Sequence, residues 1–294
     1  MILESVPNFS EGRRRDVCDA IAAAAAARGA RVLGLSLDPN HHRSVLTLAG
    51  GPDALAEAAF AAAAKAVELI DLTVHKGEHP RMGAIDVLPF IPLQGATMAE
   101  AVALAKRVGA RIGGELGVPV FLYESAATRP ERKSLPDVRK PQFEGLRELI
   151  GKDPERTPDY GPNRIHPTAG CVAVGARMPL IAYNVDLKST DLALAKRIAK
   201  KIRERDGGLP GIKALGLFLE DRGRAQVSVN VCDYTRTSPL AVFQAVEALA
   251  REAGVEVHSS EVVGLVPEAA LPPDPVRTLR LEGFSDELIL DRHL

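Results

Sequence analysis

The sequence predicts a mixed α/β (α+β) protein made of two ferredoxin-like βαββαβ-type domains, each with a mainly antiparallel sheet backed by helices. Two observations support this prediction. Apolar runs of strand length alternate with longer helical runs, and the same order of elements occurs in both halves of the chain. We therefore expect an N-terminal domain over 1–168, a C-terminal domain over 169–294 and a cleft between them.

In the first half, a strand, a helix, two strands, a second helix and a further strand give the order βαββαβ, and another helix and strand extend it. Ser10 precedes Glu11 where the first helix should begin, so we expect it to cap that helix. The abundant Pro and Gly in 125–167 predict a long connection with one short helix over 143–150. The expected strands are 2–6, 31–37, 43–49, 85–91 and 118–123, and the expected helices are 12–28, 52–71 and 97–116.

The second half repeats this order. Gly207-Gly-Leu-Pro-Gly211 follows a helical run and lacks the Lys-Ser/Thr pair of a phosphate-binding loop, so we expect a helix stop and a turn there. The last residues, 276–294, are expected to form an amphipathic helix with a tail. The expected strands lie within 171–174, 180–186, 214–219, 225–230 and 255–263, and the expected helices are 190–206 and 239–253.

The composition is that of an ordinary globular protein. Its 37 Lys and Arg against 38 Asp and Glu give a formal charge of −1, which does not direct the chain to nucleic acid or to a membrane surface. The start lacks a basic signal, and the apolar run 21–27 is too short to span a bilayer, so we expect a cytoplasmic protein. Its three cysteines, Cys18, Cys171 and Cys232, are few and far apart, which favours buried reduced thiols.

The most informative segment is His75-Lys-Gly-Glu-His79-Pro-Arg-Met-Gly83, which falls between a predicted helix and a predicted strand. Two histidines four residues apart are typical of zinc sites on helices, but Gly77 and Pro80 disfavour a helix here, so we do not expect a metal. A histidine with a pKa of about 6.5 can exchange protons near neutrality, and Glu78 or Asp38 could tune it. The alternative is a surface loop whose charges only keep it soluble.

Seven motifs occur in order along nearly the whole chain, and the loop from His75 to Gly83 is one of them. The others are Ser5-Val-Pro-Asn-Phe-Ser-Glu-Gly12, Leu88-Pro-Phe-Ile-Pro92, Leu116-Gly-Val-Pro-Val-Phe-Leu-Tyr123, Asp159-Tyr-Gly-Pro162, Ile181-Ala-Tyr-Asn184 and Val262-Val-Gly-Leu-Val-Pro267. Together they resemble the glutamate formimidoyltransferase family, and such a series is more specific than any single motif.

The resemblance implies transfer of a formimidoyl group between N5 of 5-formimidoyltetrahydrofolate and the amine of L-glutamate, as in histidine degradation. It implies a tetrahydrofolate derivative as co-substrate, no metal, and a homodimer. His79 matches the catalytic histidine of the family, and one imidazole near both nitrogens could shuttle the proton that the amine loses and N5 gains. We expect His75 to have a supporting or structural role.

Three further residues are candidates for catalytic support. Asp38 could stabilise a cationic formimidinium or orient the imidazole, or it could simply form the turn before Pro39. Arg43 could bind glutamate. Arg81 could hold a substrate carboxylate or brace the loop.

The folate-binding loop of the family maps onto residues 161–170, although a Gly/Pro hinge between the domains is an alternative or additional role. Ile165 supplies less of a flat apolar wall than a large aromatic side chain would. Lys133, Arg139 and Lys140 could attract the glutamyl carboxylates of folate or could be solvated surface charges. The folate-binding candidates are Gly161, Pro162, Asn163, Arg164, Ile165, His166, Pro167, Thr168, Ala169 and Gly170.

Two alternatives stay open from the sequence. The donor could be 5-formyltetrahydrofolate, because the same acceptor and proton shuttle would serve a formyl group. The chain could also be a non-catalytic folate-binding homologue, or a subunit that acts only with a partner. We further expect no cyclodeaminase domain of the kind fused to this unit in animal relatives, so that another protein would process the product folate.

Overall fold

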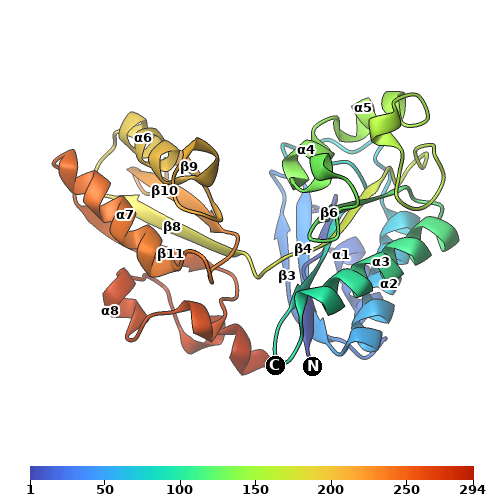
Figure 1. The fold of residues 1–294 in the computed structure, drawn as a ribbon, viewed down its shortest axis with the longest axis horizontal. Coiled ribbons are helices and arrows are strands. Elements are labelled where there is room, and N and C mark those ends of the chain that lie inside the picture. Colours follow the sequence, from blue (N-terminus) through green and yellow to red (C-terminus); the bar gives the residue numbers. More distant parts are fainter. The chain divides into compact units, whose positions relative to one another are not determined.

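The computed structural model describes residues 1–294 and divides the chain into two compact units, Met1–Arg177 and Met178–Leu294. Each unit has its own sheet backed by helices (Figure 1). The boundary expected at 168/169 is wrong, because the strand that follows it belongs to the first unit. This strand, β7 (Val172–Ala176), pairs in parallel with β5 (Ile85–Pro92) and with β6 (Val120–Glu124) of the first sheet.

The first unit contains a ferredoxin-like core whose first strand is divided in two. The two pieces, β1 (Leu3–Ser5) and β2 (Asn8–Phe9), both pair between β4 (Arg43–Gly50) and β5. On the outer side of β4 lies β3 (Arg31–Asp38), and these pairings are antiparallel. Beyond β5, the parallel strands β7 and β6 extend the sheet, so the unit is larger than the predicted βαββαβ order alone.

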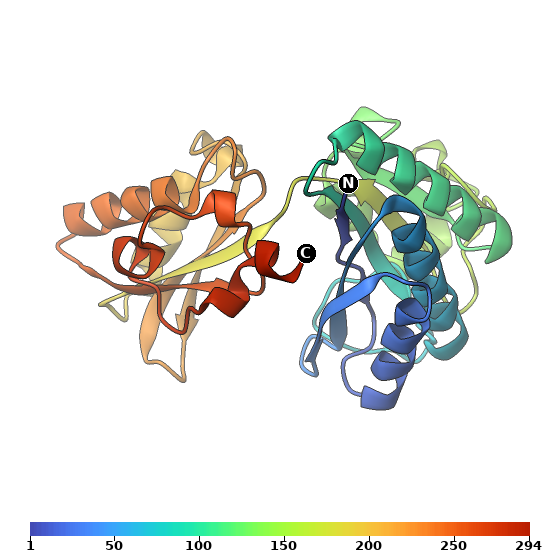
Figure 2. The same cartoon turned by 90° about the horizontal axis from the view of Figure 1, so that it is seen from below.

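Three helices cover one face of this sheet (Figures 1 and 2). Their apolar sides and the strands beneath them form a single core cluster, as the predicted amphipathic runs require. The third helix begins with a capping box in which Thr97 and Glu100 satisfy each other's backbone amides. The helices are α1 (Arg15–Ala26), α2 (Pro52–Leu69) and α3 (Met98–Glu115).

The expected cap on α1 is wrong. Ser10 donates its hydroxyl to the carbonyl of Gly83 at 2.7 Å, and so it does not cap the helix. The N-cap residue is Arg14, and no side chain accepts a hydrogen bond from the first helical amides. The carboxylate of Glu11 accepts the backbone amides of Arg13 and Arg14 at 2.9 and 3.0 Å, so it stabilises the turn that leads into the helix.

The opposite face of the first sheet carries two short helices from the long connection after β6. These are α4 (Leu135–Arg139), which was not predicted, and α5 (Gln142–Leu149), which confirms the helix expected near 143–150. They pack on this face through a second apolar cluster that includes Val138 and Leu146 from the helices and Phe121 and Tyr123 from β6. The connection is therefore an ordered layer of the first unit.

The second unit confirms the predicted βαββαβ order. Its four strands are arranged β11-β8-β10-β9, and every neighbouring pair is antiparallel. One helix packs on β9 and β10, and the other packs on β8 and β11. The elements are β8 (Ile181–Leu187), α6 (Leu192–Ile202), β9 (Ile212–Leu219), β10 (Arg224–Val231), α7 (Pro239–Glu252) and β11 (Val257–Val263).

The end of the chain differs from its prediction. The only α-helix there is α8 (Pro275–Leu279), followed by short 3₁₀ turns, so the helix expected within 276–294 is much shorter than predicted and most of this range is its tail. Arg280, in the left-handed conformation with φ 53°, ends this helix. The turn expected at Gly207 is confirmed, since this glycine has φ 88° after the last helical turn.

The cysteines and the helices bear on two further expectations. Cys18 and Cys171 are buried, Cys232 is half-buried, and no disulfide forms. The expectation of buried thiols therefore holds for two of the three. None of the helices combines the length and the apolar composition needed to cross a bilayer.

One buried carboxyl lies in the middle of the first sheet. Glu4 of β1 is only 6% exposed and is paired in register with Ala49 of β4 and Ile91 of β5. Burial raises the pKa of Glu4 to about 7, against a smaller lowering by the charge of Arg177. The folded protein therefore holds this proton at pH values where an unfolded chain has released it.

We expect Glu4→Gln to reduce the pH dependence of stability. In the wild type, stability from the protonated carboxyl is fully present below pH 4.5, the ordinary value for Glu, and is lost as the pH rises to about 7. The amide stays neutral throughout, so the variant should gain up to about 3 kcal/mol over the wild type between pH 5 and pH 8. Urea unfolding at both pH values measures this, and an identical pH dependence in the two proteins would contradict it.

Candidate active site

The loop between α2 and β5 carries the histidine motif, as the sequence predicts. Close backbone contacts hold it against the turn between β3 and β4, where the amides of Glu78 and His79 donate to the carbonyls of Asn40 and His41. A Cβ on Gly77 would lie 2.5 Å from the His41 carbonyl oxygen. Only glycine permits this approach, which brings the loop and the turn together.

The imidazole of His79 is buried, at 9% exposure, and is held by a carboxylate that the sequence did not single out. Its Nε2 lies 3.2 Å from Oδ2 of Asp86, which is completely buried at the start of β5. Since an ionised carboxylate can only accept, Nε2 carries the hydrogen. Nδ1 of His79 then presents its lone pair, and it makes no hydrogen bond within the protein.

Asp86 is the centre of a small network. Its Oδ1 accepts the backbone amide of Met82 at 2.8 Å, and its Oδ2 is 2.7 Å from Nη2 of Arg139 in α4. From the sequence, Glu78 or Asp38 was expected to tune the proton exchange of the histidine. Glu78 is exposed, and neither residue is the partner of His79. The signal for Asp86 was available, because it is a lone acid in an otherwise apolar buried strand.

His75 has both of its ring nitrogens occupied. Nε2 is 3.0 Å from the carbonyl of His42, and Nδ1 accepts the Nε hydrogen of Arg81 at 3.2 Å. Burial lowers the pKa of His75, and the nearby Arg81 charge lowers it further. This histidine is therefore fixed as a neutral imidazole, which agrees with its expected structural role.

The neighbouring His42 makes one hydrogen bond with its ring. Its Nδ1 accepts the backbone amide of Gly12 at 3.1 Å, and its ring lies 4.2 Å from that of His75. Burial and the neighbouring His75 lower the pKa of His42. Because Nδ1 of His42 and Nδ1 of His75 both accept hydrogen bonds, Nδ1 of His79 is the ring nitrogen of these three histidines that presents an unused lone pair.

Arg81 braces the loop. Its Nη1 and Nη2 contact both carboxylate oxygens of Glu144 in α5, at 3.0 and 2.7 Å, and its Nη2 also donates to the carbonyl of His75. The hydrogen bond from Arg81 lowers the pKa of Glu144. This bidentate pairing favours the bracing role over direct binding of a substrate carboxylate.

Asp38 forms a turn at the end of β3. Its Oδ1 accepts the backbone amides of Asn40 and His41 at 3.0 and 2.9 Å, and its Oδ2 is 2.7 Å from Nδ1 of His41. The backbone hydrogen bond from His41 is the main cause that lowers the pKa of Asp38. Of the two roles considered from the sequence, the geometry favours turn formation. The turn that Asp38 forms supports the loop that carries His79.

The expected folate loop meets the histidine loop at one end. Ala84 donates its amide to Ala169, and Cys171 donates its amide to Met82, both at 2.9 Å. A Cβ on Gly83 would lie 1.7 Å from the Cys171 carbonyl oxygen, so a glycine is required where the two segments cross. Two motifs that are about 90 residues apart in sequence thus lie side by side in the fold.

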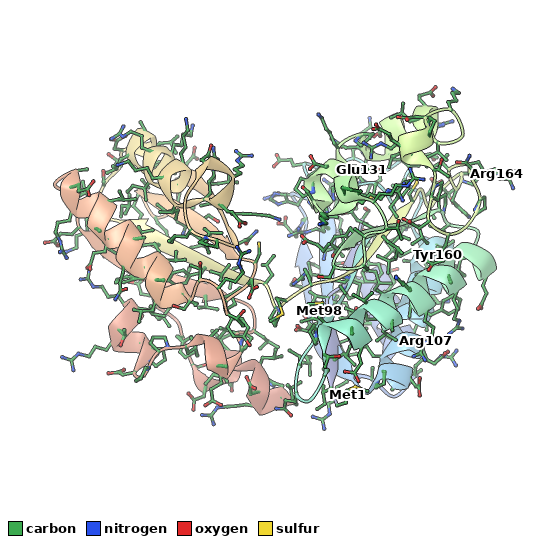
Figure 3. The ribbon with its side chains drawn as sticks, in the orientation of Figure 1. Met1, Met98, Arg107, Glu131, Tyr160 and Arg164 are labelled. Carbon is green, nitrogen blue, oxygen red and sulfur yellow. The ribbon has the colours of Figure 1, made fainter.

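The other residues of the folate loop do not reach the histidine loop. Tyr160, which precedes the folate loop, lies beside α3, and Arg164 extends into solvent (Figure 3). Ile165 packs into the apolar clusters of the unit, and Nδ1 of His166 accepts the amide of Ala169 at 3.0 Å. Gly161, Asn163 and Pro167 are exposed, and Pro162 and Thr168 are half-buried. Thr168, Ala169 and Gly170 are the members that contact the loop between α2 and β5, and the carbonyl of Thr168 accepts the amide of Leu72 at 2.8 Å.

Nothing in this region resembles a metal centre. No three His, Cys, Asp or Glu side chains come together in a group that could hold an ion. His79 contacts the carboxylate of Asp86, which in turn pairs with the guanidinium of Arg139, and such a held imidazole suits acid–base chemistry.

Comparison with known proteins places this site in a family. The model of the formiminotransferase domain, N-terminal subdomain, matches residues 2–177, and the model of the formiminotransferase domain matches residues 182–273. The chain belongs to the formiminotransferase family. The two matched ranges also agree with the two compact units of the structure.

The similarity to individual relatives extends over the full chain. It is 48% identical to glutamate formimidoyltransferase of Streptococcus pyogenes, over all of this chain and 98% of the relative. It is 44% identical to glutamate formimidoyltransferase of Thermoplasma acidophilum, over all of this chain and 97% of the relative. The formimidoyltransferase-cyclodeaminase of Mus musculus is 43% identical over 92% of this chain, which corresponds to 51% of that protein.

We expect Asp86→Asn to reverse the tautomer of His79. The amide nitrogen would donate to Nε2, so the imidazole hydrogen would move to Nδ1 and the free lone pair would be lost. ¹⁵N NMR of histidine-labelled protein distinguishes the two tautomers. The variant should also lose stability, by about 3 kcal/mol, because Arg139 loses its buried partner.

The control for this substitution is Asp159→Asn. Asp159 is also largely buried and forms an ion pair with Arg132 at 2.5 Å, but it supports β6 and does not contact His79. It should lower stability without changing the His79 signals. A wild-type spectrum that shows the imidazole hydrogen of His79 on Nδ1 would refute the assignment of Nδ1 as the nitrogen with the free lone pair.

Proposed function

We propose that this protein transfers a formimidoyl group between N5 of 5-formimidoyltetrahydrofolate and the amine of L-glutamate. The observation that supports this best is the arrangement of His79, whose Nε2 is held by the buried Asp86 while its Nδ1 remains free. The full-length similarity to two relatives named glutamate formimidoyltransferase supports the same substrates. The tetrahydrofolate derivative is a co-substrate, and the reaction needs no metal.

The proposed chemistry needs one proton to move twice. The amine of glutamate attacks the amidine carbon and forms a tetrahedral adduct, and Nδ1 of His79 takes the proton that the nitrogen releases. The same imidazolium then donates this proton to N5 as the bond between the carbon and N5 breaks. Tetrahydrofolate leaves with the proton, and the enzyme returns to its starting state.

Asp86 makes His79 suited to this proton transfer. Its carboxylate holds the ring in one orientation and lies beside the imidazolium that forms midway, so it stabilises that charge. Arg81 and His75 hold the loop in place from the other side. Asp38 contributes indirectly, since it shapes the turn on which the loop rests.

We also propose that residues 161–170 contact the folate. This proposal rests on the family motif and on the contact of Ala169 and Gly170 with the histidine loop. The exposed part of the loop offers backbone groups and small side chains to a ligand. Ile165 is engaged in core packing, so the apolar wall for the pterin would have to come from elsewhere.

Other parts of the proposed role follow from the family resemblance. They include a place in histidine degradation, a cytoplasmic location and a homodimer. These stay predictions, because they depend on partners and on cellular context.

We expect His79→Ala to reduce turnover by about 10² or more while folate binding is largely retained, because general acid–base catalysis is lost and the folate loop is unchanged. Steady-state kinetics and folate titration measure the two effects. His258→Ala, which removes a histidine of β11 in the second unit, serves as the matched control and should keep wild-type turnover. Wild-type turnover in His79→Ala would exclude His79 from catalysis.

The donor is tested directly with purified protein. We expect product from L-glutamate and 5-formimidoyltetrahydrofolate, identified as N-formimidoylglutamate by mass spectrometry. Product from 5-formyltetrahydrofolate alone would replace our proposal with formyl transfer. Folate binding without product from either donor would identify a non-catalytic homologue.

A further inference from the structure

Arg43, at the start of β4, is a cation without a partner. It is half-buried, its Nε is buried without a hydrogen bond, and it forms no ion pair. Burial lowers the pKa of Arg43. The charges of Asp38 and Asp86 oppose that effect, and the charge of Arg139 adds to it. Arg43 therefore lies within electrostatic range of the network around His79.

Arg139, the last residue of α4, is a second cation at the same place. Its Nη2 contacts Asp86, but its Nε is also buried without a hydrogen bond. Its side chain is 15% exposed, so the guanidinium is mostly removed from water. Each of the two arginines thus keeps an unused donor in a buried position.

The two unused donors of this cluster have no acceptor in the protein. The formal charges of Arg43 and Arg139 are matched by those of Asp38 and Asp86, and both carboxylates act on Arg43. However, Oδ2 of Asp86 already serves His79 and Arg139, and the carboxylate of Asp38 is engaged with His41 and with the backbone of the turn. A buried donor without an acceptor is costly, so the two Nε groups indicate that a ligand with acceptor oxygens completes the cluster.

A carboxylate has the geometry that these donors require. The Nε and Nη hydrogens of a guanidinium form a planar fork that matches two carboxylate oxygens, and both arginines have the Nε side of this fork unused. The acceptor in the proposed reaction carries such a group on the same carbon as its reacting amine. Because His79 and Arg139 share one oxygen of Asp86, a group bound at Arg139 lies beside the imidazole.

We propose that Arg43 and Arg139 together bind the α-carboxylate of the amino-acid acceptor and so direct its amine to Nδ1 of His79. The identity of the acceptor as L-glutamate rests on the proposed function. Arg139 comes from the connection between β6 and β7, so this segment supplies a substrate-binding residue as well as covering the sheet.

The test measures binding of L-glutamate in the presence of saturating tetrahydrofolate, where no group can be transferred. Calorimetric titration of Arg43→Gln and of Arg139→Gln should each show a dissociation constant raised about tenfold or more, the effect of losing one charge-assisted hydrogen bond. Arg147→Gln is the matched control: it removes the same charge from an exposed arginine of α5 and should bind glutamate like the wild type.

Thermal unfolding separates binding from a structural role. The Nε group of Arg43 has no hydrogen-bond partner in the free protein, so Arg43→Gln should unfold at or above the wild-type temperature although it binds glutamate poorly. Arg139→Gln should be less stable because Asp86 loses a partner. Wild-type glutamate affinity in both variants would overturn the proposal, and so would weaker binding in Arg43→Gln that is fully explained by unfolding.

L-Isoglutamine, in which the α-carboxylate is an amide, tests which carboxylate is bound. The wild type should bind it about tenfold or more weakly than L-glutamate, or not detectably. Equal affinity would overturn the assignment to the α-carboxylate. Failure of the proposed function is a different result, because a wild-type protein that transfers no formimidoyl group can still bind glutamate through the two arginines. An active enzyme whose arginine variants keep wild-type affinity for glutamate refutes only this inference.

Discussion

The buried carboxylate of Asp86 is the interaction on which the candidate active site depends. It joins three separate segments: from β5 it accepts the amide of Met82 and holds the ring of His79, both in the histidine loop, and it pairs with Arg139 of α4. A carboxylate without water needs all of its partners, so it fixes the positions of all three segments together. Because Asp86 lies at the start of β5, its contacts fix the histidine loop, which has no regular structure, to the sheet.

The surroundings of each histidine determine what it can do. His75 and His42 are neutral and satisfied by neighbouring groups, and burial lowers the pKa of both. They form the packed support of the loop. His79 differs because an acid holds one nitrogen and nothing in the protein uses the other. Of the imidazoles of His42, His75 and His79, that of His79 is therefore the one suited to proton transfer.

The ferredoxin-like core supplies the stable framework, and its additions supply the function. Strands β7 and β6 extend the first sheet, and the connection between them provides Arg139, Glu144 and the expected folate loop. The loop then returns to β7 beside Gly83, which brings the folate motif and the histidine motif together. Family membership over the full chain agrees with this arrangement, since both matched models are formiminotransferase domains.

The sequence by itself determined most of the elements, the two-unit organisation, the histidine loop and the family, because these depend on periodicity and on contiguous motifs. It could not identify Asp86 or Arg139, or decide between the two roles of Arg81. An aspartate in an apolar strand, or an arginine after a short helix, acquires a role only when distant segments meet. The domain boundary was misplaced for the same reason: β7 directly follows the loop, but its partners β5 and β6 lie earlier in the chain. Which carboxylate faces which imidazole is a long-range pairing, and the tertiary structure alone decides it.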